Sequence, residues 1–103
     1  MRVQHGDLIL VEVINIPEGL EWRKVSRGFV VEKGEGNHLH TTIDDCEIAE
    51  KDGVLYLREI PGCQLGVDHE EHNVKILEPG KVYRKGIEIE FDTESDEARR
   101  TRD

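Results

Sequence analysis

The sequence contains the stretch Glu47-Ile48-Ala49-Glu50-Lys51-Asp52-Gly53-Val54-Leu55-Tyr56-Leu57, in which two segments that suit β-strands flank an Asp-Gly pair. Asp-Gly between such segments is a strong short-range signal for a two-residue hairpin turn, because both residues tolerate positive φ. The second segment, residues 54–57, is rich in the branched and aromatic side chains that favour strands. We therefore predict a β-hairpin whose tip is Asp52-Gly53.

Further strands are predicted on both sides of this hairpin. Turn-forming Pro and Gly residues recur every 8 to 15 positions, a rhythm that is typical of all-β barrels and sandwiches. Between the turns lie short segments with alternating or continuous apolar character: residues 7–14, 28–33, 38–43, 63–68, 74–77 and 82–91. We predict an all-β, mostly antiparallel fold, and the turn rhythm leaves barrel and sandwich open as alternatives.

The chain has 103 residues, which suits one domain because two separate cores of half this size would be too small to be stable. We predict a single β domain over residues 1–92. Residues 93–103 are polar and have no apolar face, so we predict a C-terminal tail that is flexible or forms a short helix.

Charge and apolar composition argue against binding to nucleic acid and against a membrane span. Its net charge is −9, and residues 93–103 contribute only −1 of it, so the domain itself is strongly acidic. Such a surface repels phosphate backbones, and we predict no nucleic-acid binding. The longest apolar run, Leu8–Val11, is far below the ~20 residues of a membrane span, and the N-terminus lacks the apolar core of a signal peptide. We predict a soluble, cytoplasmic protein.

Histidines provide the main chemical hypothesis. Four of the five form two close pairs, His38 with His40 and His69 with His72. Residues i and i+2 of a strand share a face, so His38 and His40 present two imidazoles to one point. A spacing of i and i+3 does the same where the backbone turns helically, whereas on one extended strand it places the residues on opposite faces. Converging imidazoles suit zinc or another divalent transition metal.

Other chemistries have less support in the sequence. Cys46 and Cys63 form no CxxC pair, and neither Ser26 nor Ser95 lies in a nucleophile motif. The short segment Gly34-Glu35-Gly36 lacks the following Lys and Ser or Thr of a phosphate-binding loop. Hydrolase, kinase and nucleotide-binding functions are therefore not indicated.

The order of motifs resembles a family of small uncharacterised β proteins encoded by bacteria and phages. The resemblance rests on His5-Gly6-Asp7 before an apolar run, on Gly36–His40, on His69-Glu70-Glu71-His72, on Pro79-Gly80 before a Tyr, and on a closing Arg and Asp. It implies that the four paired histidines belong to one site and that the tail packs on the domain. The arrangement of His38 and His40 with a later histidine also resembles the metal site of cupin barrels, as an analogy of geometry.

Three functional hypotheses follow. The first is a β domain that binds a divalent transition metal, zinc or another, through His38, His40, His69 and His72. The second is a non-catalytic interaction or assembly module, phage-related and homo-oligomeric, in which the histidines line a polar region. The third is a small metal-dependent enzyme of cupin type, which requires an open coordination position and a nearby acid or base.

Overall fold

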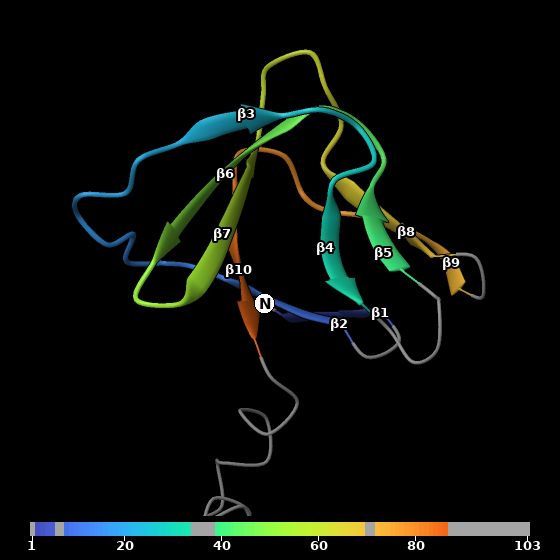
Figure 1. Ribbon diagram of the computed structural model, residues 1–103, viewed down its shortest axis with the longest axis horizontal. Coiled ribbons are helices and arrows are strands. Elements are labelled where there is room, and N and C mark those ends of the chain that lie inside the picture. Colours follow the sequence, from blue (N-terminus) through green and yellow to red (C-terminus); the bar gives the residue numbers. More distant parts are fainter. Residues whose placement is uncertain (1, 6–7, 34–38, 70–71, 87–103) are drawn as a thin grey trace, which may run out of the picture.

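The computed structural model describes residues 2–5, 8–33, 39–69 and 72–86, which form two antiparallel sheets (Figure 1). The strands are β1 (Arg2–His5), β2 (Leu8–Glu12), β3 (Arg23–Val25), β4 (Val30–Lys33), β5 (Leu39–Thr42), β6 (Cys46–Lys51), β7 (Val54–Glu59), β8 (Gly66–His69), β9 (His72–Ile76) and β10 (Val82–Gly86). The larger sheet has the order β1-β2-β10-β7-β6-β3, and the smaller has the order β4-β5-β8-β9. The prediction of an all-β fold is confirmed, and the arrangement of two sheets is sandwich-like.

The hairpin predicted around Asp52-Gly53 is the β6–β7 unit of the larger sheet. Lys51 pairs with Val54, so the turn between the strands contains two residues. Asp52 has φ of 52° and Gly53 has φ of 79°, and positive values at both positions define the primed turn that matches the twist of a hairpin. This part of the fold follows directly from the local sequence.

Strand β2 lies inside the larger sheet, between β1 and β10. Leu8, Ile9 and Leu10 are at most 1% exposed. Successive side chains of a strand point to opposite faces, so burial of three in a row means that both faces of β2 are covered. This matches the continuous apolar run that the sequence shows at this strand.

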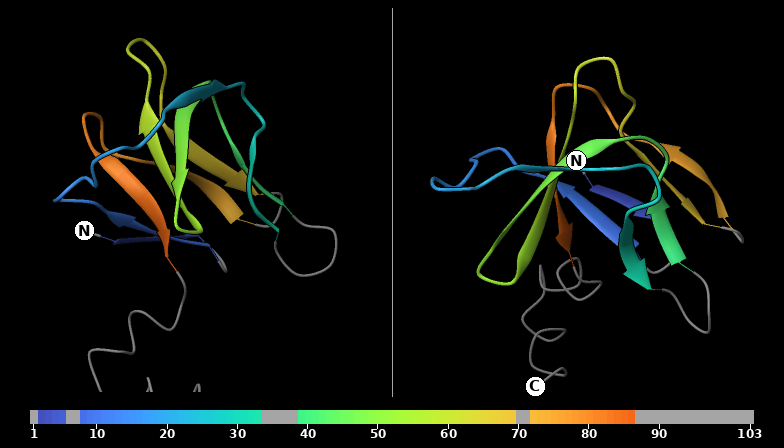
Figure 2. Two further views of the ribbon diagram at one scale, coloured as in Figure 1. Left: turned by 60° about the vertical axis from the view of Figure 1, so that its left-hand side comes forward. Right: turned by 45° about the horizontal axis from the view of Figure 1, so that its top comes forward.

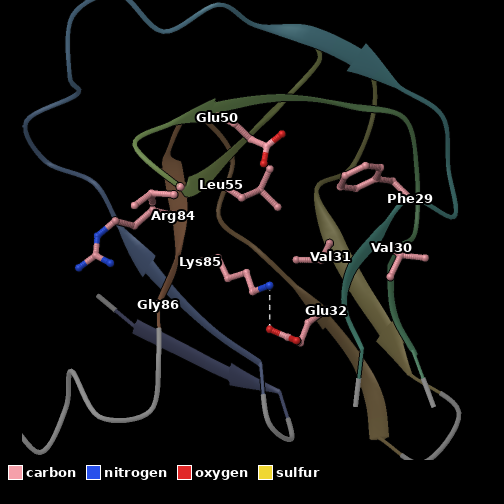
Figure 3. A pocket seen from close by; sticks show the side chains of 11 residues that line it. Phe29, Val30, Val31, Glu32, Glu50, Leu55, Arg84, Lys85 and Gly86 are labelled. Carbon is pink, nitrogen blue, oxygen red and sulfur yellow. Dashed lines mark ion pairs between the residues drawn. The ribbon is translucent and has the colours of Figure 1, made fainter. Parts of the chain in front are cut away.

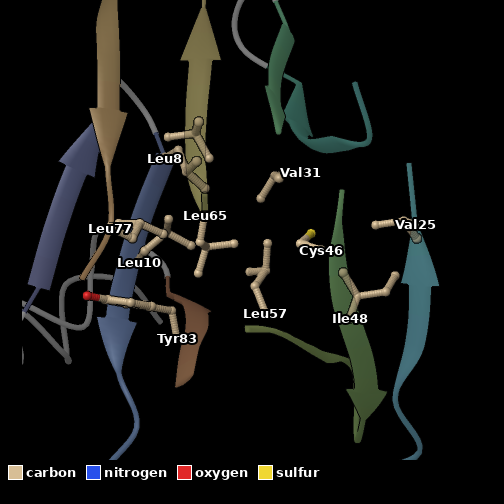
Figure 4. Close-up of a cluster of buried hydrophobic side chains, with 11 residues drawn as sticks. Leu8, Leu10, Val25, Val31, Cys46, Ile48, Leu57, Leu65, Leu77 and Tyr83 are labelled. Carbon is tan, nitrogen blue, oxygen red and sulfur yellow. The ribbon is translucent and has the colours of Figure 1, made fainter. Parts of the chain in front are cut away.

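The apolar core lies between the two sheets (Figure 4). The larger sheet supplies most of its side chains, among them Leu57 and Tyr83, which are both fully buried. The smaller sheet adds Val31 from β4 and Val67 from β8. The hydroxyl oxygen of Tyr83 accepts a hydrogen bond of 3.2 Å from the backbone N–H of Glu78, which compensates for burying a polar atom.

The chain passes between the two sheets by four connections (Figure 2). Asp44 links two of these connections by a hydrogen bond. Asp44 follows β5 of the smaller sheet and precedes β6 of the larger one. Its carboxylate accepts hydrogen bonds from the backbone N–H groups of Asp45, at 2.8 Å, and of Gln64, at 3.1 Å, and Gln64 lies in the return connection from β7 to β8. These bonds lower the pKa of Asp44 below its ordinary value of 3.8, the bond from Gln64 contributing most.

The structure adds two strands to those that the sequence predicts. Strands β1 and β3 are short and polar, and each lies at an end of the larger sheet, where few apolar side chains are needed. The predicted continuation of β10 to residue 91 and the predicted tail over 93–103 lie outside the described residues, so the boundary at residue 92 stays a prediction. Among the described residues there is no helix long and apolar enough to cross a membrane.

Candidate functional site: a row of histidines across the smaller sheet

Three of the four predicted metal ligands lie on strands of the smaller sheet. His40 is on β5, His69 ends β8 and His72 begins β9. For His69 and His72 the structure describes the backbone, and His38 lies outside the described residues. The site is therefore built from strand register and from the side chains that are described around it.

His69 and His72 are direct cross-strand partners in the antiparallel β8–β9 pair. The sequence offered a helical turn or a single extended strand for this segment, and the helical turn is wrong because both histidines lie in strands. Antiparallel partners occupy positions on the same face of a sheet, with Cβ atoms ~5 Å apart. A hairpin therefore brings an i, i+3 pair together, which a single strand does not.

The register between β5 and β8 adds His40 to this pair. Thr42 lies opposite Val67 and Thr41 opposite Asp68. One further step along the same register sets His40 opposite His69. His40, His69 and His72 thus occupy neighbouring positions on three adjacent strands, and we call these three positions the histidine row.

The histidine row lies on the inner face of the smaller sheet. On β5, His40 is 1% exposed and Thr42 3%, whereas Leu39 is 39% exposed. The sequence predicts that Leu39 and Thr41 share one face and His40 and Thr42 the other, and this alternation is confirmed. The apolar Leu39 faces outward and the histidine faces inward, which reverses the usual arrangement of a half-buried strand.

Thr42, the other buried polar residue of β5, has a structural role. Its hydroxyl oxygen accepts a hydrogen bond of 3.1 Å from the backbone N–H of Phe29, and its own backbone N–H donates to the carbonyl of Phe29 at 2.9 Å. These bonds attach β5 to the chain just before β4. Thr42 is thereby satisfied within the fold, and the other inward polar residue of this strand is His40.

Strand β4 continues the same row with a carboxylate. Glu32 is the register partner of His40, and its carboxylate oxygen lies 2.8 Å from the ammonium nitrogen of Lys85 on β10 of the larger sheet. This ion pair crosses from one sheet to the other, so it places Glu32 on the inner face independently of the register. Sequence reasoning missed Glu32 because its neighbours in the chain give no metal-site motif.

Glu32 and Lys85 also line a cavity of about 630 Å³ between the sheets (Figure 3). Phe29, Val31 and Leu55 form apolar parts of its wall. The volume falls within the range of small-molecule sites. The carboxylate end of the row therefore borders open space between the sheets.

Two irregularities in strand pairing determine which residues join the row. Between Val30 and Glu32, β4 advances two residues while β5 advances one, from Thr41 to His40. With continuous pairing Glu32 would lie opposite Leu39, on the outer face. A bulge of this kind redirects a side chain to the other face of the sheet.

The second irregularity has the same effect on β9. Between the pairs Val67–Lys75 and His69–His72, β8 advances two residues and β9 three. With continuous pairing, Asn73 would lie opposite His69 and His72 would move to the outer face. Glu32, which lies next to the histidine row on β4, and His72, which ends the row on β9, thus both owe their inward positions to a bulge.

Among the described side chains, no group of three or more His, Cys, Asp or Glu residues could hold a metal ion. The side chains of His69 and His72 are not among those that the structure describes. The predicted four-histidine site therefore stays a prediction. The backbone supports the convergence of three of its members, and the fourth, His38, precedes β5 by one residue.

The two cysteines are free thiols and lie away from the row. Burial, followed by the nearby carboxylates, raises the pKa of Cys46 to about 11. Burial and the neighbouring Asp44 carboxylate also raise the pKa of Cys63. A thiol with a raised pKa is a poor nucleophile near neutral pH, which agrees with the prediction that neither cysteine is a reactive centre.

Comparison of the chain with family models, with curated proteins and with solved structures finds no match. The resemblance to small bacterial and phage β proteins therefore stays a prediction. The functional argument rests on the geometry of the row.

Proposed function

We propose that this chain is a β domain that binds a divalent transition metal, zinc in the first instance, on the inner face of its smaller sheet. The observation that supports it is the strand register that aligns His40, His69 and His72 on β5, β8 and β9. Three imidazoles are a common ligand set for zinc, with Zn–N distances of about 2.0–2.1 Å.

The spacing of the row suits such a centre. Neighbouring strands lie ~4.8 Å apart, so the three positions span roughly 10 Å, with His69 in the middle. A shared ion would lie above the central position. His40 is 1% exposed, so it lies on the inner face of the sheet, where the proposed ion would bind.

The test is zinc affinity of the untagged protein, measured by calorimetry with chelator competition, together with metal content by plasma mass spectrometry. The variants are His69→Ala and His72→Ala, and His5→Ala is the matched control because His5 belongs to β1 of the larger sheet. Loss of an outer-shell partner costs metal sites 10- to 100-fold in affinity, so loss of a ligand is expected to cost more than about 100-fold. His5→Ala should keep the affinity of the unsubstituted chain.

Zinc should also raise the free energy of unfolding. An excess of 100-fold over the dissociation constant contributes about 2.7 kcal/mol when zinc binds the folded state alone. A chain that neither retains metal nor gains stability on addition of zinc refutes the proposal. Equal losses in His5→Ala and His69→Ala would show that the effect is not specific to the row.

A second candidate function, self-association, is favoured by the outer face of the smaller sheet. Leu39, Val74 and Ile76 are each between 39% and 50% exposed. All three lie on the outer face by register and alternation: Leu39 is next to the buried His40, and Ile76 pairs with Gly66. An apolar face beside β9, which ends the described sheet, suits pairing with a second copy of the chain.

Light scattering coupled to size-exclusion chromatography tests this second function. We expect a dimer whose population falls in Val74→Glu, because a charge placed in an apolar contact must lose its hydration. The control is Lys51→Glu, an exposed change at the tip of the larger sheet. A strict monomer at high concentration refutes self-association and leaves the metal proposal unaffected.

A further inference from the structure

The inner face of the smaller sheet holds a fourth residue with ligand chemistry, which the sequence motifs did not indicate. Glu32 lies beside His40 in the register of β4 and β5, as His69 does on the other side. Its separation from His40 is one strand spacing, ~4.8 Å, the same as between the histidines. A carboxylate therefore extends the row of three imidazoles.

We infer that Glu32 is a carboxylate ligand of the proposed metal centre and that Lys85 competes with the metal for it. The inference rests on the proposed function, and adds a ligand and a competing cation to it. Zinc accepts mixed imidazole and carboxylate ligands, and a carboxylate also suits manganese and iron.

Three observations support Glu32 in this role. The bulge at Val31 turns Glu32 to the inner face, where it would otherwise lie on the outer face opposite Leu39. The ion pair with Lys85 shows that the carboxylate points toward the larger sheet, and therefore away from the outer face. Bulges are frequent next to functional sites, and a second bulge gives His72 its place in the same row.

The span of the row is compatible with one ion. The four positions Glu32, His40, His69 and His72 cover three strand spacings, roughly 14 Å. An ion above the central pair would lie about 7 Å along the row from each outer position, half of that span. Lys85 competes with a metal bound there, because its ammonium already neutralises the carboxylate and two cations that share one carboxylate repel each other.

Lys85 is a suitable competitor because the ion pair is accessible. The side chains of Lys85 and Glu32 are 31% and 32% exposed. Ion pairs at such positions contribute little to stability, so breaking this one opposes metal binding only weakly. The ammonium released by the metal then faces the cavity that both residues line.

The experiment compares zinc affinity in four forms of the full chain: unsubstituted, Glu32→Gln, Lys85→Met and the double variant. We expect Glu32→Gln to weaken zinc binding by more than about 100-fold, as for the loss of another ligand. We expect Lys85→Met to strengthen it by up to about fivefold, the equivalent of one exposed ion pair. In the Glu32→Gln background the Lys85→Met effect should vanish, since the two residues act through one contact.

Glu50→Gln is the matched control, because Glu50 lines the same cavity from β6 and lies outside the row. It should leave zinc affinity unchanged. The visible spectrum of bound Co²⁺ is a second readout, which should change in Glu32→Gln and stay the same in Glu50→Gln. A role of Glu32 in folding alone would alter the melting temperature of the metal-free chain without altering that spectrum.

The outcomes separate this inference from the function beneath it. Zinc binding that depends on His69 but is equal in Glu32→Gln and in the unsubstituted chain overturns Glu32 as a ligand and leaves the histidine site intact. An effect of Lys85→Met that persists in the Glu32→Gln background overturns the competition. Absence of zinc binding by the unsubstituted chain overturns the proposed function and this inference together.

Discussion

The two sheets bury different kinds of side chain. The larger sheet turns mainly aliphatic and aromatic residues inward, among them Leu10, Ile48, Leu57 and Tyr83. Its inward polar groups have partners: the Tyr83 hydroxyl accepts a hydrogen bond from the backbone, and the Lys85 ammonium pairs with Glu32. The smaller sheet turns His40 and Thr42 inward beside Val31 and Val67, and leaves Leu39 and other apolar residues outside. Burying polar groups costs stability unless they have partners. The larger sheet therefore supplies most of the apolar core, whereas the smaller sheet contributes the buried polar side chains.

The largest expected effect is in the larger sheet. Leu57→Ala removes a fully buried side chain from the centre of the core and should lower the free energy of unfolding by about 2–5 kcal/mol. Urea titration followed by circular dichroism measures it. The loss should be the same with and without zinc, because Leu57 belongs to β7 and the row to the other sheet. A loss that zinc reverses would contradict the division between the sheets.

Gly66→Ala is the next largest expected effect, and it tests packing within the smaller sheet. A Cβ at Gly66 would lie 2.7 Å from the carbonyl oxygen of Lys75 and 2.7 Å from the Cδ1 atom of Ile43. Overpacking of this kind costs about 1–3 kcal/mol, again measured by urea titration. Adding Ile43→Val removes the Cδ1 atom and should recover part of the loss, whereas full recovery would show that the backbone contact with Lys75 is relaxed.

A smaller effect, visible mainly in acid, is expected at the link between the sheets. Because hydrogen bonds hold the pKa of Asp44 below 3.8, its carboxylate stabilises the fold above that pH, and the contribution is lost as pH falls through the lower pKa of the folded state. Asp44→Asn should therefore lower stability at pH 7 and show a weaker further loss from about pH 5 downward. Thermal unfolding across this range measures it. The control Asp52→Asn, at the hairpin tip, should retain the acid dependence of the unsubstituted chain.

The smallest expected effect is that of Val74→Thr, which we compare with the same change at Val67 on the adjacent strand. Val74→Thr changes an exposed position on the outer face of β9 and should alter the free energy of unfolding by no more than about 0.5 kcal/mol. Val67→Thr places a hydroxyl at a fully buried position of β8 and should cost about 1–3 kcal/mol. Chemical denaturation of both variants under the same conditions decides the comparison. Equal costs would mean that the outer face is covered.

The sequence predicts the elements whose signals are local. Asp52-Gly53 determines the β6–β7 turn through its own backbone preferences, and the apolar run of β2 indicates burial on both faces. Strand β3 was missed because Arg23 and Lys24, exposed at the edge of the sheet, have no strand signal of their own. Its pairing with β6 comes from the fold around it.

The sequence identifies the histidine positions of the candidate site, but it does not predict how the strands align them. Spacing alone selects the two histidine pairs. The alignment of His40 with His69, in contrast, depends on pairing between β5 and β8, and 23 residues of the chain lie between these strands. The sequence also gives no sign that Glu32 belongs with them, because its place depends on an irregularity in strand pairing. Long-range register of this kind is a property of the folded sheet and has no local code.

The bulge at Val31 has a consequence for how this site changes over evolutionary time. Removing the codon of Val31 would let β4 and β5 pair continuously with Glu32 still opposite His40, so Glu32 would keep its face while the core would lose a buried side chain. Deleting Asn73 or Val74 would likewise leave His72 opposite His69. The register of the proposed row therefore survives loss of either bulge. Homologous genes with one codon fewer at these positions are expected to keep the same residues aligned across the smaller sheet.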